Sequence, residues 1–246
     1  MKKLLVFILV FSFAISMSAC QLLMQEVRNE EALLSPNMGP GVVAGNAPNV
    51  EPSIEETPVL TFEEMTTADR WEINTVLSHF VDTGLKSFDR TAPSETDLFR
   101  FVQSNTYYHN YQKILLSDDG QYYYLTADDV AATLREYFNL EVEQPLAISE
   151  PTFYKDDAYY WPCADGDMAT EFASVSSIQY LADSGLYQVD FDVYSPYDLF
   201  TMEIEGYYSF AHDAISARDD LMHVASGTAQ ISYEDGQCII YSIQVN

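Results

Sequence analysis

The sequence predicts an α+β fold, with three N-terminal helices packed on one face of a curved antiparallel sheet. Apolar residues repeat with helical spacing in three segments before residue 140, and after Pro151 the apolar period switches to two. Strands with one apolar and one polar face belong to an antiparallel sheet that is covered on one side only. Because helices followed by such strands pack as layers, we expect a single α+β domain over residues 61–246.

Three segments combine an N-terminal cap with an apolar stripe at helical spacing. The caps are Thr66 with Asp69, Ser94 with Asp97, and Thr126 with Asp129. The stripes are Ile73, Val76, Leu77 and Phe80; then Leu98, Phe101 and Val102; then Val130, Leu134, Tyr137 and Phe138. Gly84 and Asn139 supply stop signals after the first and the third segment.

Strand signals surround three turns. The turns are Asp118-Asp119-Gly120 between residues 114–116 and 122–125, Asp183-Ser184-Gly185 before residue 187, and Asp235-Gly236 between residues 223–234 and 237–245. Alternation is clearest where one strand face carries Tyr187, Val189, Phe191 and Val193. Phe200, Met202 and Ile204 alternate with polar residues in the same way, which predicts another strand.

The N-terminus has the composition of a lipoprotein signal peptide. Lys2 and Lys3 precede a short apolar run that ends in Met17-Ser18-Ala19-Cys20. This pattern resembles the bacterial lipobox, in which Cys20 carries a diacylglycerol thioether and becomes the mature N-terminus. We expect a signal peptide over residues 1–19, a Pro- and Gly-rich tether over residues 20–60, and a location at the extracytoplasmic face of the cell membrane.

The charge excludes one class of partner. The chain has 11 Lys and Arg against 38 Asp and Glu, a net charge of −27. Without residues 1–19, 9 basic residues face the same 38 acids, a charge of −29. Such a field repels nucleic acid and favours cationic partners: basic proteins, divalent metals or amine-bearing wall polymers. Alternatively, the acidic surface serves only solubility.

The cysteines and two acidic segments offer candidate chemistry, each with a simpler alternative. Cys163 and Cys238 either form a disulfide outside the membrane or remain free thiols in strands. Asp165 and Asp167 are candidate calcium ligands, but Cys163 stands where a calcium loop needs oxygen, so an acidic turn is the better interpretation. Asp190 and Asp192 share a strand face, as a catalytic carboxylate pair would and as solvated acids would.

The sequence carries no motif for nucleophilic, metal-dependent or phosphate-binding catalysis. Cys163 lacks a matched base, since the four histidines follow no catalytic pattern. They are His79, His109, His212 and His223. We therefore predict no catalytic residue, no metal site and no cofactor.

Tyrosine is frequent, with 18 residues, and it occurs in clusters. The clusters are Tyr107 and Tyr108, Tyr122 to Tyr124, Tyr159 and Tyr160, and Tyr207 and Tyr208. Neighbours in a strand point to opposite faces, so one tyrosine of each pair can be buried while the other is exposed. Exposed tyrosines suit protein or glycan recognition, whereas cross-strand packing alone would also account for them.

Several short sequence motifs resemble those of a known group of proteins. They are Ile73-Asn74 with Leu77-Ser78 and Phe80, Tyr137-Phe138, Tyr159-Tyr160 with Ala164-Asp165-Gly166-Asp167, Tyr187 to Tyr194, and Gly227-Thr228-Ala229. In these motifs and their order the chain resembles uncharacterised lipid-anchored surface proteins of Gram-positive, clostridia-like bacteria. The element order also resembles the NTF2-like or cystatin-like cone. Neither resemblance implies a catalytic residue.

Two functions are consistent with these features. The first is a surface lipoprotein that acts as a tethered binding or inhibitory module for basic envelope proteins. The second is an envelope enzyme that acts through carboxylates on a wall polymer or peptide. An exposed tyrosine-rich face with no pocket would favour the first, whereas a concave apolar pocket with convergent acids would favour an enzyme or a ligand carrier.

Overall fold

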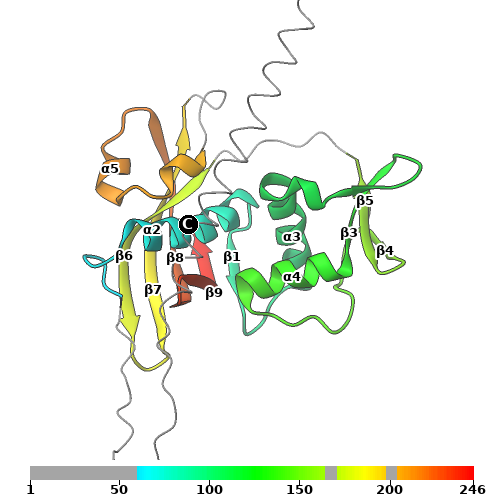
Figure 1. Ribbon diagram of the computed structural model, residues 1–246, viewed down its shortest axis with the longest axis horizontal. Helices are drawn as coiled ribbons and strands as arrows, with labels where there is room; N and C mark the ends of the chain where they lie inside the picture. Colours follow the sequence, from blue (N-terminus) through cyan, green and yellow to red (C-terminus); the bar gives the residue numbers. More distant parts are fainter. Residues whose placement is uncertain (1–59, 164–170, 198–203) are drawn as a thin grey trace, which may run out of the picture. The chain divides into compact units, whose positions relative to one another are not determined.

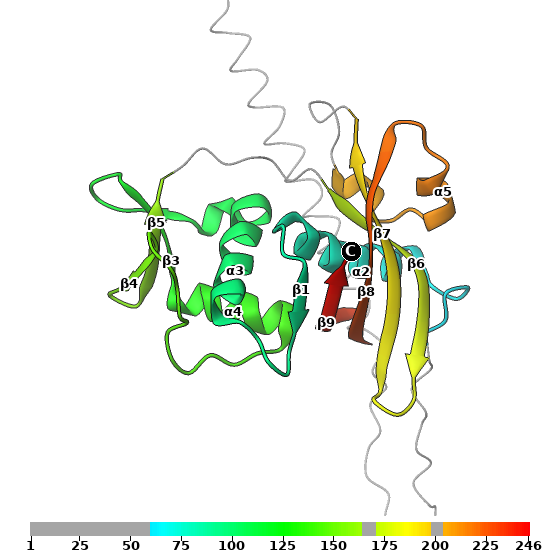
Figure 2. The ribbon, with the colours of Figure 1, turned by 180° about the vertical axis from the view of Figure 1, so that it is seen from behind.

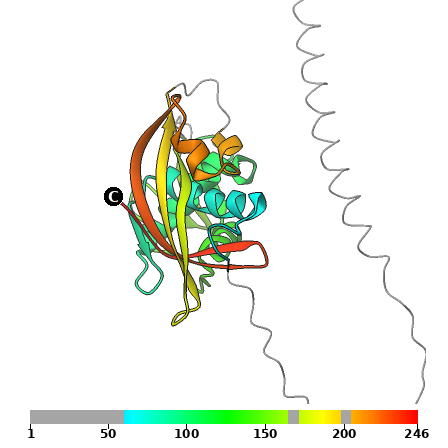
Figure 3. The ribbon, with the colours of Figure 1, turned by 90° about the vertical axis from the view of Figure 1, so that its left-hand side faces the viewer.

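Helices and two antiparallel sheets make up the part of the chain that the computed structural model describes, residues 60–163, 171–197 and 204–246 (Figure 1). All of these residues belong to one compact unit, Thr57–Asn246. The α+β class is confirmed, with a curved, unclosed antiparallel sheet (Figure 3). None of the helices in these ranges is both long and apolar enough to cross a membrane.

The three predicted helices are confirmed together with their caps. They are α2 (Thr67–Asp82), α3 (Glu95–His109) and α4 (Ala127–Phe138). The hydroxyls of Thr66, Ser94 and Thr126 each accept a hydrogen bond from the backbone N–H three residues later, which satisfies one free donor of the first turn. Asn139 ends α4 in the left-handed conformation.

The larger sheet has five strands in the order β1-β9-β8-β7-β6, all antiparallel. The strands are β1 (Ser87–Asp89), β6 (Phe172–Leu181), β7 (Leu186–Pro196), β8 (Leu221–Glu234) and β9 (Gln237–Val245). Strands β6 to β9 form a meander, and the turn Asp235-Gly236 joins the last two with positive φ at both residues. The short β1 extends the sheet beyond β9, a pairing that the sequence pattern does not indicate.

A second sheet of four short strands has the order β2-β3-β5-β4. The strands are β2 (Leu115–Leu116), β3 (Tyr122–Thr126), β4 (Phe153–Lys155) and β5 (Ala158–Pro162). The hairpin around Asp118-Asp119-Gly120 is confirmed as β2 and β3. The chain returns after α4 to add β5 and β4 at the other side of β3.

Helix α2 crosses the inner face of the five-stranded sheet and contacts β6 and β9 (Figure 1). Polar side chains of α2 form hydrogen bonds with the backbone of β6. The Asn74 side chain accepts from the backbone N–H of Val175 at 2.9 Å, and the Ser78 hydroxyl accepts from that of Ala173 at 2.8 Å. Asn74 also donates to the Tyr208 carbonyl at 2.8 Å. These bonds satisfy polar groups that would otherwise be buried at a cost, and they fix where α2 lies on the sheet.

One apolar core joins both sheets to the helices. Helix α3 packs beside α2, and α4 contacts both β3 and β9. Phe99 of α3 stacks on Tyr159 of β5 with ring centroids 4.8 Å apart, and Phe101 meets Phe138 of α4 edge-on at 4.8 Å. Each sheet therefore buries one face in this core.

The predicted strand over residues 200–204 is wrong at its one described position. Ile204 begins a 3₁₀ helix, η3 (Ile204–Tyr207), and residues 198–203 lie outside the described ranges. Tyr207 and Tyr208 are both buried in a small second core with Phe172 and Ile215. Ile215 belongs to the short α5 (His212–Ser216). Because Tyr207 and Tyr208 are buried in this second core, the chain forms η3 here and not the strand that the alternating pattern predicts.

Candidate functional site

An aromatic row crosses the outer face of the four-stranded sheet. Leu115, Tyr124, Tyr160 and Phe153 are register partners from one strand to the next. Their neighbours along β3 and β5 face the core, so these four residues face outward. Leu115 and Phe153 are 42% and 37% exposed, and the two tyrosines are half-buried. We call these four residues the aromatic row.

The rings of the row contact one another in a continuous series. Phe153 and Tyr160 are nearly parallel, with centroids 5.1 Å apart, and Tyr160 stacks on Tyr124 at 5.0 Å. Tyr122 adds an edge contact with Phe153 at 5.1 Å. The hydroxyls of Tyr124 and Tyr160 make no hydrogen bond with another described residue, so they can bond to a partner.

Acidic turns lie at both ends of this sheet. Asp118 and Asp119 lie in the β2–β3 turn, and Asp156 and Asp157 lie in the β4–β5 turn. Because β3 and β5 are antiparallel neighbours, these turns are at opposite ends of the strands. Hydrogen bonds from the Gln121 backbone N–H and the Ser117 hydroxyl lower the pKa of Asp119, which keeps it ionised. Acidic turns therefore flank the aromatic row at both ends, and Lys155 of β4 pairs with Asp156 at 3.5 Å.

The outer face of the five-stranded sheet is polar instead. At its Asp192 end the short α5 contacts it through His212, and α2 lies on the opposite face (Figure 2). One line of register partners crosses β7, β8, β9 and β1, and a second line runs beside it. The first line is Gln188, Gln230, Ser242 and Asp89, and the second is Asp190, Thr228, Gln244 and Ser87. We call these eight residues the polar face.

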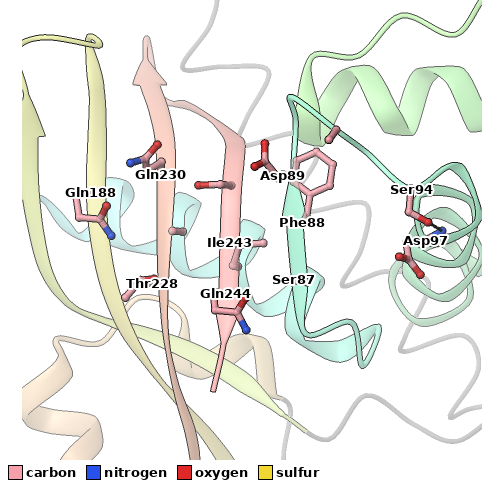
Figure 4. A pocket seen from close by; sticks show the side chains of 13 residues that line it. Ser87, Phe88, Asp89, Ser94, Asp97, Gln188, Thr228, Gln230, Ile243 and Gln244 are labelled. Carbon is pink, nitrogen blue, oxygen red and sulfur yellow. Dashed lines mark hydrogen bonds between the residues drawn. The ribbon is translucent and has the colours of Figure 1, made fainter.

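A groove with a cavity volume of about 490 Å³ opens over much of the polar face (Figure 4). Ser94 and Asp97 at the start of α3 form its far wall. The groove thus offers amide, hydroxyl and carboxylate groups, which suit hydrogen bonding to a polar ligand. Two hydrogen bonds from Thr91 lower the pKa of Asp89, so this carboxylate is ionised at neutral pH.

Asp190 and Asp192 do not act as a pair, because each has its own partners. Asp190 accepts from the Ser177 hydroxyl at 2.7 Å. Asp192 is contacted by His212 at 2.8 Å, by His223 at 3.1 Å and by the Ser226 hydroxyl at 2.6 Å. Burial alone would raise the pKa of Asp192, but these bonds hold it below its usual value. The Asp192 cluster ties β7, β8 and α5 together.

The histidines, which follow no pattern in the sequence, form two groups around aspartates. His212 and His223 converge on Asp192, as described above. His79 and His109 stack with centroids 3.6 Å apart, and His109 Nε2 lies 3.2 Å from Asp82 Oδ2. Each group combines residues from different elements, so only the folded chain brings them together. The only local hint in the sequence is that His79 and Asp82 lie three residues apart on the same helix, α2.

The two described cysteines are free thiols, so the disulfide between them is not formed. Cys163 is exposed just after β5 of the smaller sheet, whereas Cys238 is buried in β9 of the larger one. Cys20, Asp165 and Asp167 lie outside the described residues. Within the described ranges, no group of three or more His, Cys, Asp or Glu has the arrangement to hold a metal ion.

The tyrosine pairs behave differently from one another. Tyr159 is buried and Tyr160 is half-buried on the outer face, as alternation in a strand predicts. Tyr207 and Tyr208 are both buried, so the prediction is wrong for them. Tyr107 and Tyr108 lie in α3 and not in a strand.

Comparison of this chain with known protein families, curated proteins and solved structures gave no match.

Proposed function

We propose that this protein is a surface lipoprotein, anchored through Cys20, that acts as a binding or inhibitory module for basic proteins of the cell envelope. The observation that carries the proposal is the aromatic row flanked by acidic turns. The polar face supplies a contrast: an outer sheet surface in this same chain is built from amide, hydroxyl and carboxylate side chains.

Long-range attraction would bring the partner to the protein. A formal charge of −27 creates a negative potential that raises the encounter rate with a basic protein and suppresses encounters with acidic ones. Aspartates at both ends of the small sheet extend this field to the margins of the aromatic row. Charge therefore favours a partner with basic residues around an apolar contact surface.

The aromatic row would supply the short-range contact. Tyrosine buries a large area at low conformational cost and offers a hydroxyl to the partner, and such residues dominate many protein interfaces. Ring stacking along the row already orders these side chains, which lowers the entropy lost on binding.

The tether would set where binding takes place. A flexible segment of roughly forty residues has an r.m.s. reach of about 35 Å, which lifts the domain from the membrane into the wall. Replacement of Cys20 by Ala should therefore leave the precursor unprocessed or release the protein. Intact-mass analysis tests this, since a mature N-terminus other than lipid-modified Cys20 would contradict it.

The alternative is an envelope enzyme that acts through carboxylates, and the groove over the polar face is its best location. Asp89 and Asp97 both line this groove. A glycosidase needs one carboxylic acid whose pKa is raised so that it can donate a proton. Hydrogen bonds from Thr91 lower the pKa of Asp89, so this carboxylate suits the role of base or nucleophile and not that of the proton donor.

Salt dependence tests the proposed function. The purified protein should bind a cationic wall hydrolase such as lysozyme, with an affinity that falls steeply as salt shortens the Debye length from about 10 Å at 0.1 M to about 3 Å at 1 M. Calorimetry at several salt concentrations provides the measurement. Salt-independent affinity would reject the charge mechanism. Turnover of a wall polymer by the purified protein, abolished by Asp89→Asn or Asp97→Asn, would favour the enzyme.

A further inference from the structure

A second pocket lies apart from both sheet surfaces and shares no residue with the aromatic row or the polar face. It has a cavity volume of about 450 Å³, and five elements contribute to its lining. Helix α2 supplies Trp71, Glu72 and His79, and the ends of α3 and α4 supply His109, Glu136 and Tyr137. Glu205 of η3, Tyr208 just after η3, and Cys238 of β9 also line it.

Three carboxylates at this pocket lack a cationic partner. Glu72, Glu136 and Glu205 form no salt bridge with any described residue. Burial raises the pKa of Glu72, the backbone N–H of Cys238 opposes this with a hydrogen bond, and the charge of Glu136 adds to the rise. Two negative charges thus repel each other at a partly buried position, and a bound cation would relieve that repulsion.

Rings form much of the pocket wall. Trp71 is 46% exposed, an unusual exposure for so large a side chain, and Tyr137 and Tyr208, which also line the pocket, are buried. Burial raises the pKa of both tyrosines, so they stay neutral. The negative faces of such rings attract organic cations.

His79, at the inner end of the pocket, adds no positive charge at neutral pH to oppose a cation. Burial, with the neighbouring His109, lowers the pKa of His79 to about 3, so this ring is neutral at pH 7. The His109 side chain is 7% exposed, and its Nε2 lies 3.2 Å from Asp82 Oδ2, so its partner is a carboxylate that does not line the pocket.

From the cavity, its rings and its uncompensated carboxylates we propose that this pocket binds a small organic cation carrying an alkylammonium group. The ammonium lies between Glu72 and Glu136 and faces Trp71, and the alkyl part extends toward Tyr137 and Tyr208. This site goes beyond the proposed function, because it needs neither the aromatic row nor a protein partner.

Calorimetric titration of the purified full-length protein tests the site with two probes, 1,4-diaminobutane and choline, at millimolar concentration. The neutral 1,4-butanediol is the matched control ligand. Binding of the diamine alone identifies a primary ammonium site, and binding of choline identifies a quaternary one. Absence of binding by both cations, or equal binding of the neutral diol, overturns the proposal.

Variants locate the binding. Glu72→Gln and Glu136→Gln should each weaken cation binding about five- to tenfold, since each removes one attracting charge without changing shape. Trp71→Ala should weaken it about two- to fivefold. Glu143→Gln removes the same charge from an exposed position outside the pocket and should leave the affinity unchanged.

Equal affinity in Glu72→Gln and in the parent protein, with both shown to be folded by circular dichroism, overturns the assignment to this pocket. Loss of lysozyme binding in these variants is not expected, so this test can fail independently of the proposed function.

Discussion

The two sheets of this protein share one core and differ in what they show to solvent. Both are antiparallel, and each has one face buried against the helices. The outer face of the five-stranded sheet carries Gln188, Gln230 and Thr228, whereas that of the four-stranded sheet carries Tyr124, Tyr160 and Phe153. The two sheets thus share antiparallel pairing and one buried face, and their outer faces differ in chemistry.

This difference indicates that the aromatic row has a role beyond stabilising the fold. A sheet covered on one side needs apolar residues only on its inner face, and the polar face of the larger sheet follows that rule, whereas Met222 and Val224 further along β8 are 46% and 41% exposed. The smaller sheet adds a second apolar surface that faces water. Cross-strand contacts between the rings contribute some stability, about 0.2–1 kcal/mol for each pair. Exposure of a contiguous aromatic row nevertheless has a solubility cost, which a binding role would offset.

The largest expected effect contrasts adjacent tyrosines of β5. Tyr159→Ala should lower the free energy of unfolding by about 3–5 kcal/mol, because the buried ring packs on Phe99 and its hydroxyl accepts from the Leu146 N–H at 2.8 Å. Tyr160→Ala should cost about 1 kcal/mol or less, because its ring is half exposed. Urea unfolding measures both values, and equal losses would show that the outer row is structural.

A smaller loss is expected from Gly227→Ala on the inner face of the larger sheet. A Cβ at Gly227 would lie 2.3 Å from the Phe191 ring and 2.8 Å from the backbone oxygen of Gln244. Relief of this overlap requires movement of core groups, so we expect a loss of about 1–3 kcal/mol in urea unfolding. Gly206→Ala is the matched control, since no atom lies within 4 Å of its added Cβ. A neutral Gly227→Ala would mean that β7 and β8 are not packed as described.

The pH dependence of stability tests the helix-covered side of the larger sheet, where α2 places His79. Burial lowers the folded-state pKa of His79 to about 3, against about 6.5 in the unfolded chain. Between these values only the unfolded chain binds the proton, so stability falls as pH decreases from 6.5 toward 3, by up to about 1.4 kcal/mol per pH unit.

His79→Gln should remove this contribution. The raised pKa of buried Asp82 gives a slope of opposite sign, so the informative quantity is the difference between the parent and the variant. Parallel stability curves for the two proteins between pH 5 and pH 7 would contradict the burial of His79.

Thiol labelling compares the exposure of one cysteine next to the smaller sheet with that of one in the larger sheet. The expected effect on stability is the smallest of those described. In protein carrying Cys20→Ala, the exposed Cys163 should react with a thiol reagent in the folded state. Cys238 should react only after unfolding, because it is buried and because burial and the charge of Glu72 raise its pKa. Two unreactive thiols that appear only after reduction would demonstrate the disulfide that the structure lacks.

Local signals in the sequence predicted most of the helices and turns. Thr66 with Asp69, and Thr126 with Asp129, are caps whose partners lie three residues away, so the chain itself specifies them. Asp235-Gly236 similarly specifies its hairpin. The failure at Ile204 came where tertiary burial of Tyr207 and Tyr208 decided the conformation.

The candidate sites were beyond the reach of such local signals. The aromatic row depends on the register of four strands, and β4 and β5 lie on the far side of α4 from β3 in the sequence. Tyr124 and Tyr160 were recognised as members of tyrosine clusters but could not be placed side by side. The same holds for Asp192 with His212 and His223, which long-range pairing of β7 and β8 brings together.

The most direct test of the aromatic row as the binding surface is a comparison of two double variants in lysozyme binding at low salt. Tyr124→Ser with Tyr160→Ser should weaken affinity about 10- to 100-fold, as expected when central aromatic contacts are lost. Gln188→Ser with Gln230→Ser on the polar face, and Tyr197→Ser at a side chain that is 68% exposed elsewhere, should leave affinity unchanged. Full affinity in the tyrosine double variant, or a larger loss in the glutamine double variant, would contradict the assignment.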